Sequence, residues 1–482
     1  MSSNKARLVK GMADFLPNQF STQCYQKIVR VGEKVAKSFD YAFMQTPIVE
    51  ERKLFERSLG SDTDIISKEM FVLASRDPLE SNKLCLRPEN TASVMRSILE
   101  NSLSTKQRIY YHGPMFRYEN PQKGRQRQFH QFGVEFMGSD HYQCDVESIE
   151  MAYQFLSGVL DGQTNLFSLE INSIGTLSER EAYQEELLNF ITKHKDFFFM
   201  TKPGTEIDPQ HPEQTKYEFS KDSRDRIEKA ILEKNPRRIW RILDSKRDEH
   251  LISHAIKHLG MPQLEQFQSE DNRKRFENVL KCLKWLNIPY EINPSLIRGL
   301  DYYTHTTFEF KSLVIGAKST VLAGGRYDTL SKQLGGNEAI PAVGWASGLE
   351  RLTILLEDLE SKKPKNDKTT YIPKVFIAVA RTLSNSKMTE DDLLQHSLKL
   401  ATLLRSKGFT VNYQEKGNLS KQLRQAQSSN SLLCCVIGEE EFEKGQVVLR
   451  NMQLGTQESI PVNMLSSAIE KHFSEYEKTL SS

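Results

Sequence analysis

Residues 115–135 read MFRYENPQKGRQRQFHQFGVE, and the pattern of apolar and polar residues here is the most informative in the chain about its fold. It joins the ends of two apolar-patterned segments, Ile109–Glu119 and Gln128–Gly138, which we predict to be neighbouring strands. The intervening residues, 120–127, are polar and contain proline and glycine, as connecting loops do. The pattern therefore predicts two adjacent strands of one sheet with a polar loop between them.

The two predicted strands have faces of different character. Side chains along a strand alternate between faces, so Phe132, Val134 and Phe136 share a side that is suited to a core. The opposite face carries Arg127, Gln131 and Glu135 on the second strand and Arg117 and Glu119 on the first. Such a face either forms a binding site or is simply exposed to water, because buried charges without partners are costly.

Local charge favours a binding site. Residues 106–128 contain six Lys and Arg and one acidic residue, Glu119, a local net charge of 6 − 1 = +5. A basic loop above polar strands suits an anionic ligand. Neither GxxxxGK[ST] nor GxGxxG occurs, so arginines would have to bind any phosphate groups.

Composition sets the outer limits. The chain has 482 residues, 65 Lys and Arg against 63 Asp and Glu, and a mean hydropathy of −0.53. This length corresponds to two to four domains, at roughly 100–200 residues each. Aromatic residues make up 9%, which excludes a mostly disordered chain, and no apolar run reaches the ~18 residues of a membrane span. A net charge of +2 gives no overall hint of nucleic acid.

Cysteine and histidine spacing predicts no metal site. The six cysteines form no CxxC pair, which argues against a disulfide framework or a zinc site and for a reduced compartment. No signal-peptide core opens the chain. His250, His254 and His258 recur at helical spacing, but lysine and arginine surround them and no HExxH occurs, so we interpret them as a polar helix face.

Periodicity divides the chain into five parts. We expect a helix at 21–39 with Ser21 as N-cap, then an extended segment, Ala42–Val49, containing Pro47. Residues 176–289 are charged and largely helical, and 221–247 carry ten basic and five acidic residues, a net +5. Strands and helices alternate after a polar linker. The predicted parts are a first core segment 1–172, an insertion 173–290, a second core segment 291–360, a linker 361–371 and a C-terminal domain 372–482.

Four further segments have the composition of binding loops. LRPENT at 86–91 contains Glu89 and Thr91, and LIRGLDYYTHTTFEF at 296–310 contains Arg298, Tyr302 and Tyr303. AGGRYD at 323–328 and VGWASGLERL at 343–352 are rich in glycine, which permits close approach of the backbone to a ligand. Ordinary turns, and a surface charge at Arg351, are equally possible interpretations of each segment taken alone.

Together these segments resemble the class II aminoacyl-tRNA synthetases, and specifically the histidyl-tRNA synthetases of bacterial or organellar type. In order they are KGMADFLP at 10–17, motif 1 at 44–51, motif 2 at 115–135, IRGLDYY at 297–303, AGGRYD at 323–328, motif 3 at 347–352 and an anticodon-domain pattern at 419–452. The resemblance implies an α+β core, with an antiparallel sheet of six or seven strands flanked by helices. It also implies a helical insertion and a C-terminal α/β anticodon-binding domain.

The resemblance implies a role for individual residues. Arg117 would contact the ATP α-phosphate and the substrate carboxylate, Glu119 the adenine and Arg351 the far end of the triphosphate. Arg298 would lie beside the α-phosphate and, with Arg117, act in catalysis. The implied histidine-binding residues are Glu89, Asn90, Thr91, Arg117, Gln131, Glu135, Arg298, Tyr302, Tyr303 and Tyr327.

The implied reaction is activation of L-histidine by ATP with Mg²⁺, followed by transfer to the 3′ end of tRNA(His), without a tightly bound cofactor. A homodimer built on motif 1 and a cytoplasmic location are expected, with mitochondrion or another organelle as the alternative, and no membrane association. Lys416, Lys421 and Arg424 are candidate phosphate contacts in the anticodon domain.

Several residues depart from the commonest family pattern. Asn120 stands where many bacterial members have arginine, Asn90 where glycine is usual and Lys10 where arginine is frequent. The insertion is also longer around Phe197–Asn235.

Two related classes of protein stay open as alternatives. A regulatory paralogue that binds histidine would typically lack the anticodon domain and lose catalytic arginines. A prolyl or threonyl enzyme would not carry IRGLDYY and AGGRYD.

Overall fold

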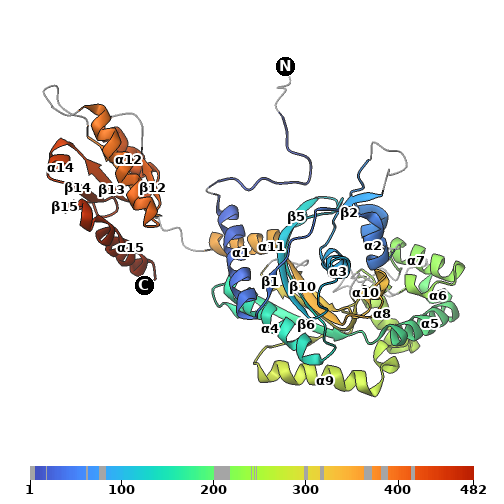
Figure 1. Cartoon of the computed structure of the whole chain (residues 1–482). Coiled ribbons are helices and arrows are strands. Elements are labelled where there is room, and N and C mark those ends of the chain that lie inside the picture. The colour runs from blue at the N-terminus through green and yellow to red at the C-terminus, as the bar shows by residue number, and fades with distance from the viewer. Residues whose placement is uncertain are drawn as a thin grey trace, which may run out of the picture. The chain divides into compact units, whose positions relative to one another are not determined.

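The computed structural model describes residues 6–17, 19–60, 63–74, 83–199, 218–239, 242–243, 245, 247–297, 302–314, 320–362, 372–380, 389–413 and 418–481. The chain forms two compact units, Met1–Lys363 and Pro364–Ser482 (Figure 1). Within the predicted linker, residues 363–371 lie outside the described residues.

The first unit is built on a sheet whose six central strands are antiparallel to their neighbours. Its order is β1-β4-β5-β10-β9-β8-β6-β7, with β1 and β7 added parallel at the two edges. In the described residues this sheet thus has eight strands, where the resemblance implied six or seven, and the six antiparallel strands are extended by the two-residue edge strands β1 and β7. The bounds are β1 Ala42–Phe43, β4 Gln107–Phe116, β5 Gln128–Met137, β10 Ala342–Gly348, β9 Thr320–Arg326, β8 Thr304–Ser312, β6 Phe167–Ser173 and β7 Glu291–Ile292.

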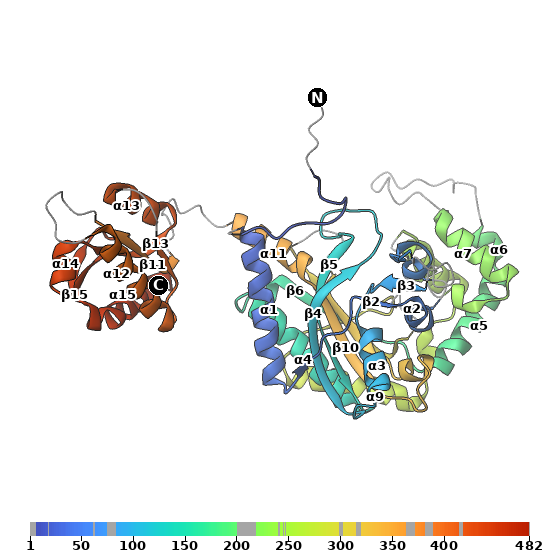
Figure 2. The same cartoon turned by 45° about the horizontal axis from the view of Figure 1, so that its top comes forward.

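The predicted hairpin forms the second and third strands of this sheet. β4 and β5 pair antiparallel from Gln107–Met137 to Phe116–Gln128. Phe132, Val134 and Phe136 are buried on the face covered by helices, as their alternation predicted. The helical layer consists of α1 Phe20–Ser38, α4 Tyr142–Val159, α9 Glu270–Trp285 and α11 Leu349–Ser361 (Figure 2).

The start of α1 corrects one prediction. The helix begins at Phe20, one residue before the expected cap Ser21, and Gln19 holds the N-cap position without a side-chain hydrogen bond. The prediction of Ser21 as N-cap was wrong, because the helix already includes Phe20, a residue with low helix propensity. The extended segment that follows splits around Pro47 into β1 and β2 Val49–Glu51, and β2 pairs with β3 Leu84–Leu86.

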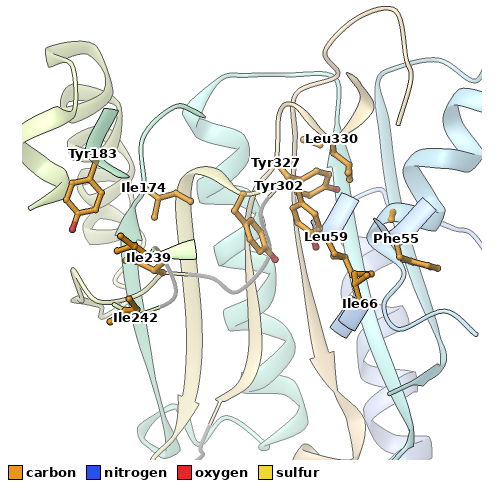
Figure 3. Packing of buried hydrophobic residues seen from close by; sticks show 14 of the residues in the cluster. Phe55, Leu59, Ile66, Ile174, Tyr183, Ile239, Ile242, Tyr302, Tyr327 and Leu330 are labelled. Atoms are coloured by element: carbon orange, nitrogen blue, oxygen red, sulfur yellow. The ribbon is translucent and has the colours of Figure 1, made fainter. Parts of the chain in front are cut away.

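A second apolar cluster lies on the other face of the sheet. It includes residues of α2 Arg52–Leu59, α3 Thr91–Glu100 and α10 Leu330–Gln333, together with Tyr302 and Tyr327. Figure 3 shows Tyr302 and Tyr327 close to each other within this cluster. The tyrosine rings therefore belong to the packed core and also, as described below, to a cavity.

The segment predicted as an insertion is helical where it is described. It contains α5 Leu177–Lys193, α6 Lys195–Phe198, α7 Lys221–Leu232, α8 Glu249–His254 and then α9. Much of the lengthened part, residues 200–217, lies outside the described residues. Val279 and Leu283 of α9 pack in the helical layer on the large sheet. No described helix is long and apolar enough to cross a membrane.

The second unit contains a five-stranded sheet in the order β12-β11-β13-β14-β15. β12, β11 and β13 are parallel to one another. β14 runs antiparallel to β13, and β15 runs antiparallel to β14. The sequence predicted this alternation but missed β15 and α14, which have five residues each. The bounds are β11 Ile372–Val379, α12 Glu390–Ser406, β12 Val411–Tyr413, α13 Leu419–Ser428, β13 Ser431–Ile437, α14 Glu439–Glu443, β14 Gln446–Asn451, β15 Gln457–Pro461 and α15 Leu465–Ser481.

Candidate functional site

Two cavities with a common wall lie on the sheet face opposite the helical layer. The larger cavity has a volume of about 310 Å³ and the smaller cavity about 80 Å³. Both are lined by Arg117, Gln131, Ala323 and Ala346. A ligand in one cavity would therefore lie next to a ligand in the other, with Arg117 able to reach both.

Small residues form the floor of the smaller cavity. Glu135 of β5 is opposite Gly344 of β10, which is opposite Gly325 of β9. A Cβ atom on Gly344 would lie 1.9 Å from Oε2 of Glu135 and 2.3 Å from the carbonyl oxygen of Val134. Gly133 similarly makes room for the ring of Tyr111. Glycine at these positions is what allows a carboxylate and a tyrosine ring to lie flat on the sheet.

Glu135 is the centre of a hydroxyl network. Thr91 Oγ1 donates a hydrogen bond to its Oε1 at 2.7 Å and Tyr111 Oη donates to the same atom at 3.2 Å. Tyr327 Oη donates to Oε2. Burial raises the pKa of Glu135 to about 8, against the opposing effect of the hydrogen bonds from Tyr327 and Thr91. At neutral pH this favours the protonated carboxyl, which can donate as well as accept a hydrogen bond.

Glu89 holds the first turn of α3 beside this network. Its carboxylate accepts hydrogen bonds from the backbone N–H groups of Thr91, at 2.7 Å, and Ala92, at 3.0 Å. These are donors that the start of a helix leaves without partners in the helix itself. Burial raises the pKa of Glu89 although these bonds oppose the shift. The arrangement sets the position of Thr91 and hence its bond to Glu135.

Arg117 and Gln131 form the polar part of the common wall. Arg117 Nε donates to the carbonyl oxygen of Pro88 at 3.0 Å, and its guanidinium lies 5.2 Å from the centroid of the Phe129 ring. Gln131 Oε1 is buried and accepts no hydrogen bond from any residue that the structure describes. A buried acceptor without a partner costs free energy unless a ligand donates to it.

The larger cavity is rich in arginine. Arg117, Arg125 and Arg351 all line it. Arg351 Nη1 donates to the carbonyl oxygen of Thr320 at 2.6 Å, and burial and then the charge of Arg125 lower its pKa. Arg125 forms an ion pair with Glu119 at 2.9 Å. Guanidinium groups with several donors suit phosphate oxygens, so this cavity fits a polyanion.

The other predicted residues divide into three groups. Tyr302, Tyr303 and Tyr327 line the smaller cavity, with centroid distances of 4.8 Å for the first pair and 5.7 Å between Tyr302 and Tyr327. Asn90 is buried but does not line either cavity. Arg298 lies outside the described residues.

The structure adds residues that the sequence did not single out. Glu350 lines the larger cavity and accepts hydrogen bonds from the backbone N–H of His130, at 2.9 and 3.0 Å. Phe129 and Tyr111 also line the cavities. Phe129 has the same strand parity as Gln131 and Glu135, so alternation could have identified it, but its apolar ring pointed to the core. No sequence signal linked Glu350 to His130, because 220 residues separate them.

The AGGRYD segment combines cavity residues with a buried anchor. Arg326 is fully buried, and its Nε donates to Asp145 at 2.7 Å while Nη1 donates to Asp328 at 2.9 Å. Arg275 of α9 forms an ion pair with the same Asp145. Ala323 and Tyr327 of this segment line the smaller cavity, and the buried ion pairs of Arg326 anchor the backbone next to Tyr327.

Comparisons with known proteins find similarity along almost the whole chain. A family profile described as "Histidyl-tRNA synthetase" matches residues 11–189 and 214–352, and one described as "Anticodon binding domain" matches residues 374–472. A protein named histidine–tRNA ligase from Synechococcus elongatus is 39% identical over 458 residues, which are 94% of this chain and 92% of the relative. A relative of the same name from Rhodospirillum rubrum is 36% identical over 459 residues, 95% of this chain and 97% of its own.

Solved structures are similar as well. The apo histidyl-tRNA synthetase of S. aureus superposes with a TM-score of 0.70 at 26% identity, over 96% of this chain and all of the other. The histidyl-tRNA synthetase of Nostoc sp. PCC 7120 has a TM-score of 0.62 at 20% identity over 97% of this chain and all of its own, which supports the fold.

Proposed function

The chain belongs to the histidyl-tRNA synthetase family and joins histidine to tRNA, and from that premise we propose which residues carry out the first step. The observation that carries the proposal is the common wall: Arg117 and Gln131 line both cavities. The larger cavity takes ATP and the smaller takes histidine, so the reacting carboxylate and α-phosphate meet at Arg117.

The arginines of the larger cavity bind the triphosphate. Arg117 contacts the α-phosphate and the histidine carboxylate, and Arg351 contacts the far end of the triphosphate. Glu119, paired with Arg125, contacts the adenine. Arg298, by resemblance, adds a second positive charge at the α-phosphate. Attack of the carboxylate oxygen on the α-phosphate releases pyrophosphate, and preorganised guanidinium groups stabilise the negative charge that develops.

The smaller cavity recognises the imidazole. Glu135 accepts a hydrogen bond from one ring nitrogen, and the unpartnered Oε1 of Gln131 accepts from a second donor of the bound histidine. Glu89, Thr91, Tyr302, Tyr303 and Tyr327 complete the pocket. A pocket that forms hydrogen bonds to its ligand rejects analogues that leave its polar groups unpaired, by about 10⁴-fold or more.

Histidine-dependent exchange of labelled pyrophosphate into ATP tests this assignment. The purified chain should catalyse exchange with histidine and not with proline or threonine. Exchange that depends on proline or threonine, and not on histidine, would overturn the assignment of the smaller cavity. Aminoacylation of a bacterial-type tRNA(His), in which the histidyl group is transferred to the terminal 3′-hydroxyl, tests the second step.

A substitution tests the role given to Arg298. Arg298→His should abolish adenylate formation and leave histidine binding measurable by calorimetry, because the charge is needed at the α-phosphate and not at the imidazole. Full exchange activity in this variant would contradict the role.

Mg²⁺ enters this proposal with ATP as part of the substrate. Carboxylates are the ligands that Mg²⁺ prefers, and Glu309 and Glu350 both line the larger cavity near Arg351. The donor set therefore fits a hydrated ion carried by the phosphates. Exchange should cease in EDTA and return on addition of excess Mg²⁺.

The proposed assembly is a homodimer formed through motif 1. Apolar side chains at Phe43, Ile48, Val49 and Leu84 are 38–47% exposed on the first unit. An adjoining hollow of about 820 Å³ is lined by Pro47, Val49 and Leu84 among others. A surface of this kind is typical of a protein–protein interface. Ile48→Asp with Val49→Asp should shift the mass measured by light scattering from dimer to monomer.

The proposed division of labour follows the predicted parts. Residues 1–172 and 291–360 form the catalytic core, 173–290 the insertion and 372–482 the anticodon-binding domain, in which Lys421 and Arg424 contact phosphates. The relatives described above are bacterial, and we propose a cytoplasmic location, which fractionation of the source cell would test against an organelle.

A further inference from the structure

A buried polar cluster of three side chains lies behind the smaller cavity and outside its lining. Thr46, Arg87 and Asn90 are 4%, 3% and 1% exposed, and none of them lines either cavity. Asn90 thus lies outside the lining of the smaller cavity, whereas the resemblance placed it among the histidine-binding residues. The role of the Asn90 side chain therefore lies in its contacts with the protein groups around it.

The carbonyl oxygen of the Asn90 side chain joins the other two members. Oδ1 accepts a hydrogen bond from Thr46 Oγ1 at 2.6 Å and one from Arg87 Nη1 at 3.0 Å. Arg87 Nη1 also donates to the carbonyl oxygen of Thr46, at 3.0 Å, and Arg87 Nε donates to that of Pro114, also at 3.0 Å. The cluster thus ties the motif 1 segment to the end of β4 and to the start of α3.

Removing the acceptor would leave the buried Thr46 hydroxyl without its acceptor, and Arg87 Nη1 would keep only the carbonyl and hydroxyl oxygens of Thr46, at 3.0 and 2.9 Å. Burial lowers the pKa of Arg87, which reports how costly its charge is at this position. A buried donor that loses its acceptor costs free energy, and the loss is larger when the donor is charged. The backbone around residue 90 would therefore have to move if Asn90 lost its oxygen.

The residues on both sides of Asn90 carry the two proposed substrate contacts. The carbonyl oxygen of Pro88 accepts the 3.0 Å hydrogen bond from Arg117 Nε. Thr91 Oγ1 donates the 2.7 Å hydrogen bond to Glu135. A shift of the 87–91 backbone would thus disturb Arg117 and Glu135 together, although neither contacts Asn90 through any hydrogen bond described above.

We propose that Asn90 is a positioning residue, which holds the 87–91 backbone through Thr46 and Arg87 and thereby sets the geometry of the histidine cavity. This inference rests on the proposed function, since it assigns histidine to the smaller cavity. It adds a role for the motif 1 residue Thr46 in histidine recognition, by way of Asn90. Glu89 and Thr91 line only the smaller cavity, so histidine binding should suffer more than ATP binding.

The test uses two matched pairs of variants of the full chain. Asn90→Ala removes the acceptor, while Asn90→Asp keeps an oxygen for Thr46 and Arg87. Thr46→Val removes the donor, while Thr46→Ser keeps a hydroxyl. Pyrophosphate exchange then gives kcat and the KM values for histidine and for ATP, and thermal unfolding shows whether each variant is folded.

Asn90→Ala and Thr46→Val should raise the KM for histidine by about tenfold, the order expected when a buried charged or hydroxyl donor loses its partner. The KM for ATP should rise by less than the KM for histidine, because Arg117 is one of three arginines that line the larger cavity. Asn90→Asp and Thr46→Ser should restore the wild-type values. The inference would be overturned if Asn90→Ala and Thr46→Val raised the KM values for histidine and ATP equally or changed neither of them. It would also be overturned if Asn90→Asp and Thr46→Ser did not restore the wild-type KM for histidine. Absence of histidine-dependent exchange in the wild-type chain would instead contradict the proposed function itself. If Asn90→Ala is unfolded, the Thr46 pair alone decides.

Discussion

Thr91 Oγ1 lies 2.7 Å from Glu135 Oε1, and this hydrogen bond joins the first residue of α3 to the C-terminal half of β5. It connects two segments that are 44 residues apart in the chain. The N-terminus of α3 and the buried residue Glu135 of β5 thereby form a single polar wall. The hydrogen bonds and the raised pKa of Glu135 follow from that placement.

Glu135 should make stability depend on pH in a defined direction. Its pKa is raised in the folded chain from 4.5 to about 8, chiefly by burial. The folded state therefore favours the protonated form, and the contribution to stability is present below pH 4.5 and is lost as pH rises through about 8. Because glutamine does not titrate, Glu135→Gln should gain Tm relative to wild type between pH 5 and pH 8.5. A difference in Tm that stays constant over this range would contradict the assignment.

Gly344 should not tolerate a methyl group. Alanine there would place its Cβ 1.9 Å from Glu135 Oε2 and 2.3 Å from a backbone carbonyl oxygen. Overpacking of this kind costs about 1–3 kcal/mol, and Glu135 would be pushed out of its network. Gly344→Ala should therefore lower Tm and weaken histidine binding in calorimetry.

Gly348, on the same strand, provides the control for that substitution. A Cβ at this position meets no heavy atom within 4 Å. Gly348→Ala should leave Tm nearly unchanged. Equal losses in the two variants would show that strand geometry in general, and not the contact with Glu135, is responsible.

Asp248 should stabilise the insertion. Its carboxylate accepts hydrogen bonds from the backbone N–H of Ser220 at 2.7 Å and from the hydroxyls of Ser220, Ser223 and Ser245 at 2.8, 2.5 and 2.6 Å. Burial alone would raise its pKa, but these bonds hold the pKa below its ordinary value of 3.8. Asp248→Asn should cost about 1–3 kcal/mol in urea unfolding, because an amide nitrogen cannot accept these donors.

The stability that Asp248 contributes should depend on pH. A depressed folded pKa contributes stability above pH 3.8 that is lost as pH falls through the folded value, so wild type and Asp248→Asn should converge in acid. Asp222→Asn serves as control, since Asp222 is exposed and pairs with Arg226 across one turn of α7. That change should cost roughly 0.5 kcal/mol or less. If the stabilities of wild type and Asp248→Asn moved further apart as the pH fell, the lowered pKa assigned to Asp248 would be contradicted.

Arg237 and Arg238 should contribute to tRNA binding if the basic part of the insertion contacts the acceptor stem. Arg237 is 68% exposed in its side chain and pairs with Glu181 at 2.8 Å, while Arg238 pairs with Glu233 at 3.0 Å. Reversal of both charges should weaken tRNA binding and flatten its salt dependence, because fewer counterions are released. Filter binding at several salt concentrations measures both.

The Arg237–Glu181 pair provides a control for that experiment. Exchanging the two charges, Arg237→Glu with Glu181→Arg, keeps the pair and the net charge of the surface. Binding should recover at least in part. Unchanged tRNA affinity in the reversed variant would contradict a contact at this position.

Different parts of the site were predictable to different degrees. Alternation along residues 128–138 placed Gln131 and Glu135 on the face opposite Phe132, and the structure agrees. The resemblance brought in Tyr302, Tyr303 and Tyr327, which line the smaller cavity. It also placed Asn90 among the ligand contacts, whereas the structure turns that side chain toward Thr46 and Arg87. A local pattern cannot say which buried neighbour a side chain meets, because Thr46 lies 44 residues from Asn90 in the chain, although Arg87 is only three residues away.

Residue patterns predicted most of the longer strands and helices, the apolar face of β5 and the family that the chain resembles. These are properties of neighbouring residues, and the periods of strands and helices make them visible. Only the tertiary structure decided that Arg117 borders two cavities, that Gly344 makes room for Glu135, and that Glu350 holds His130 across 220 residues. Such relations depend on strand order and register, which bring together side chains that no spacing along the chain connects.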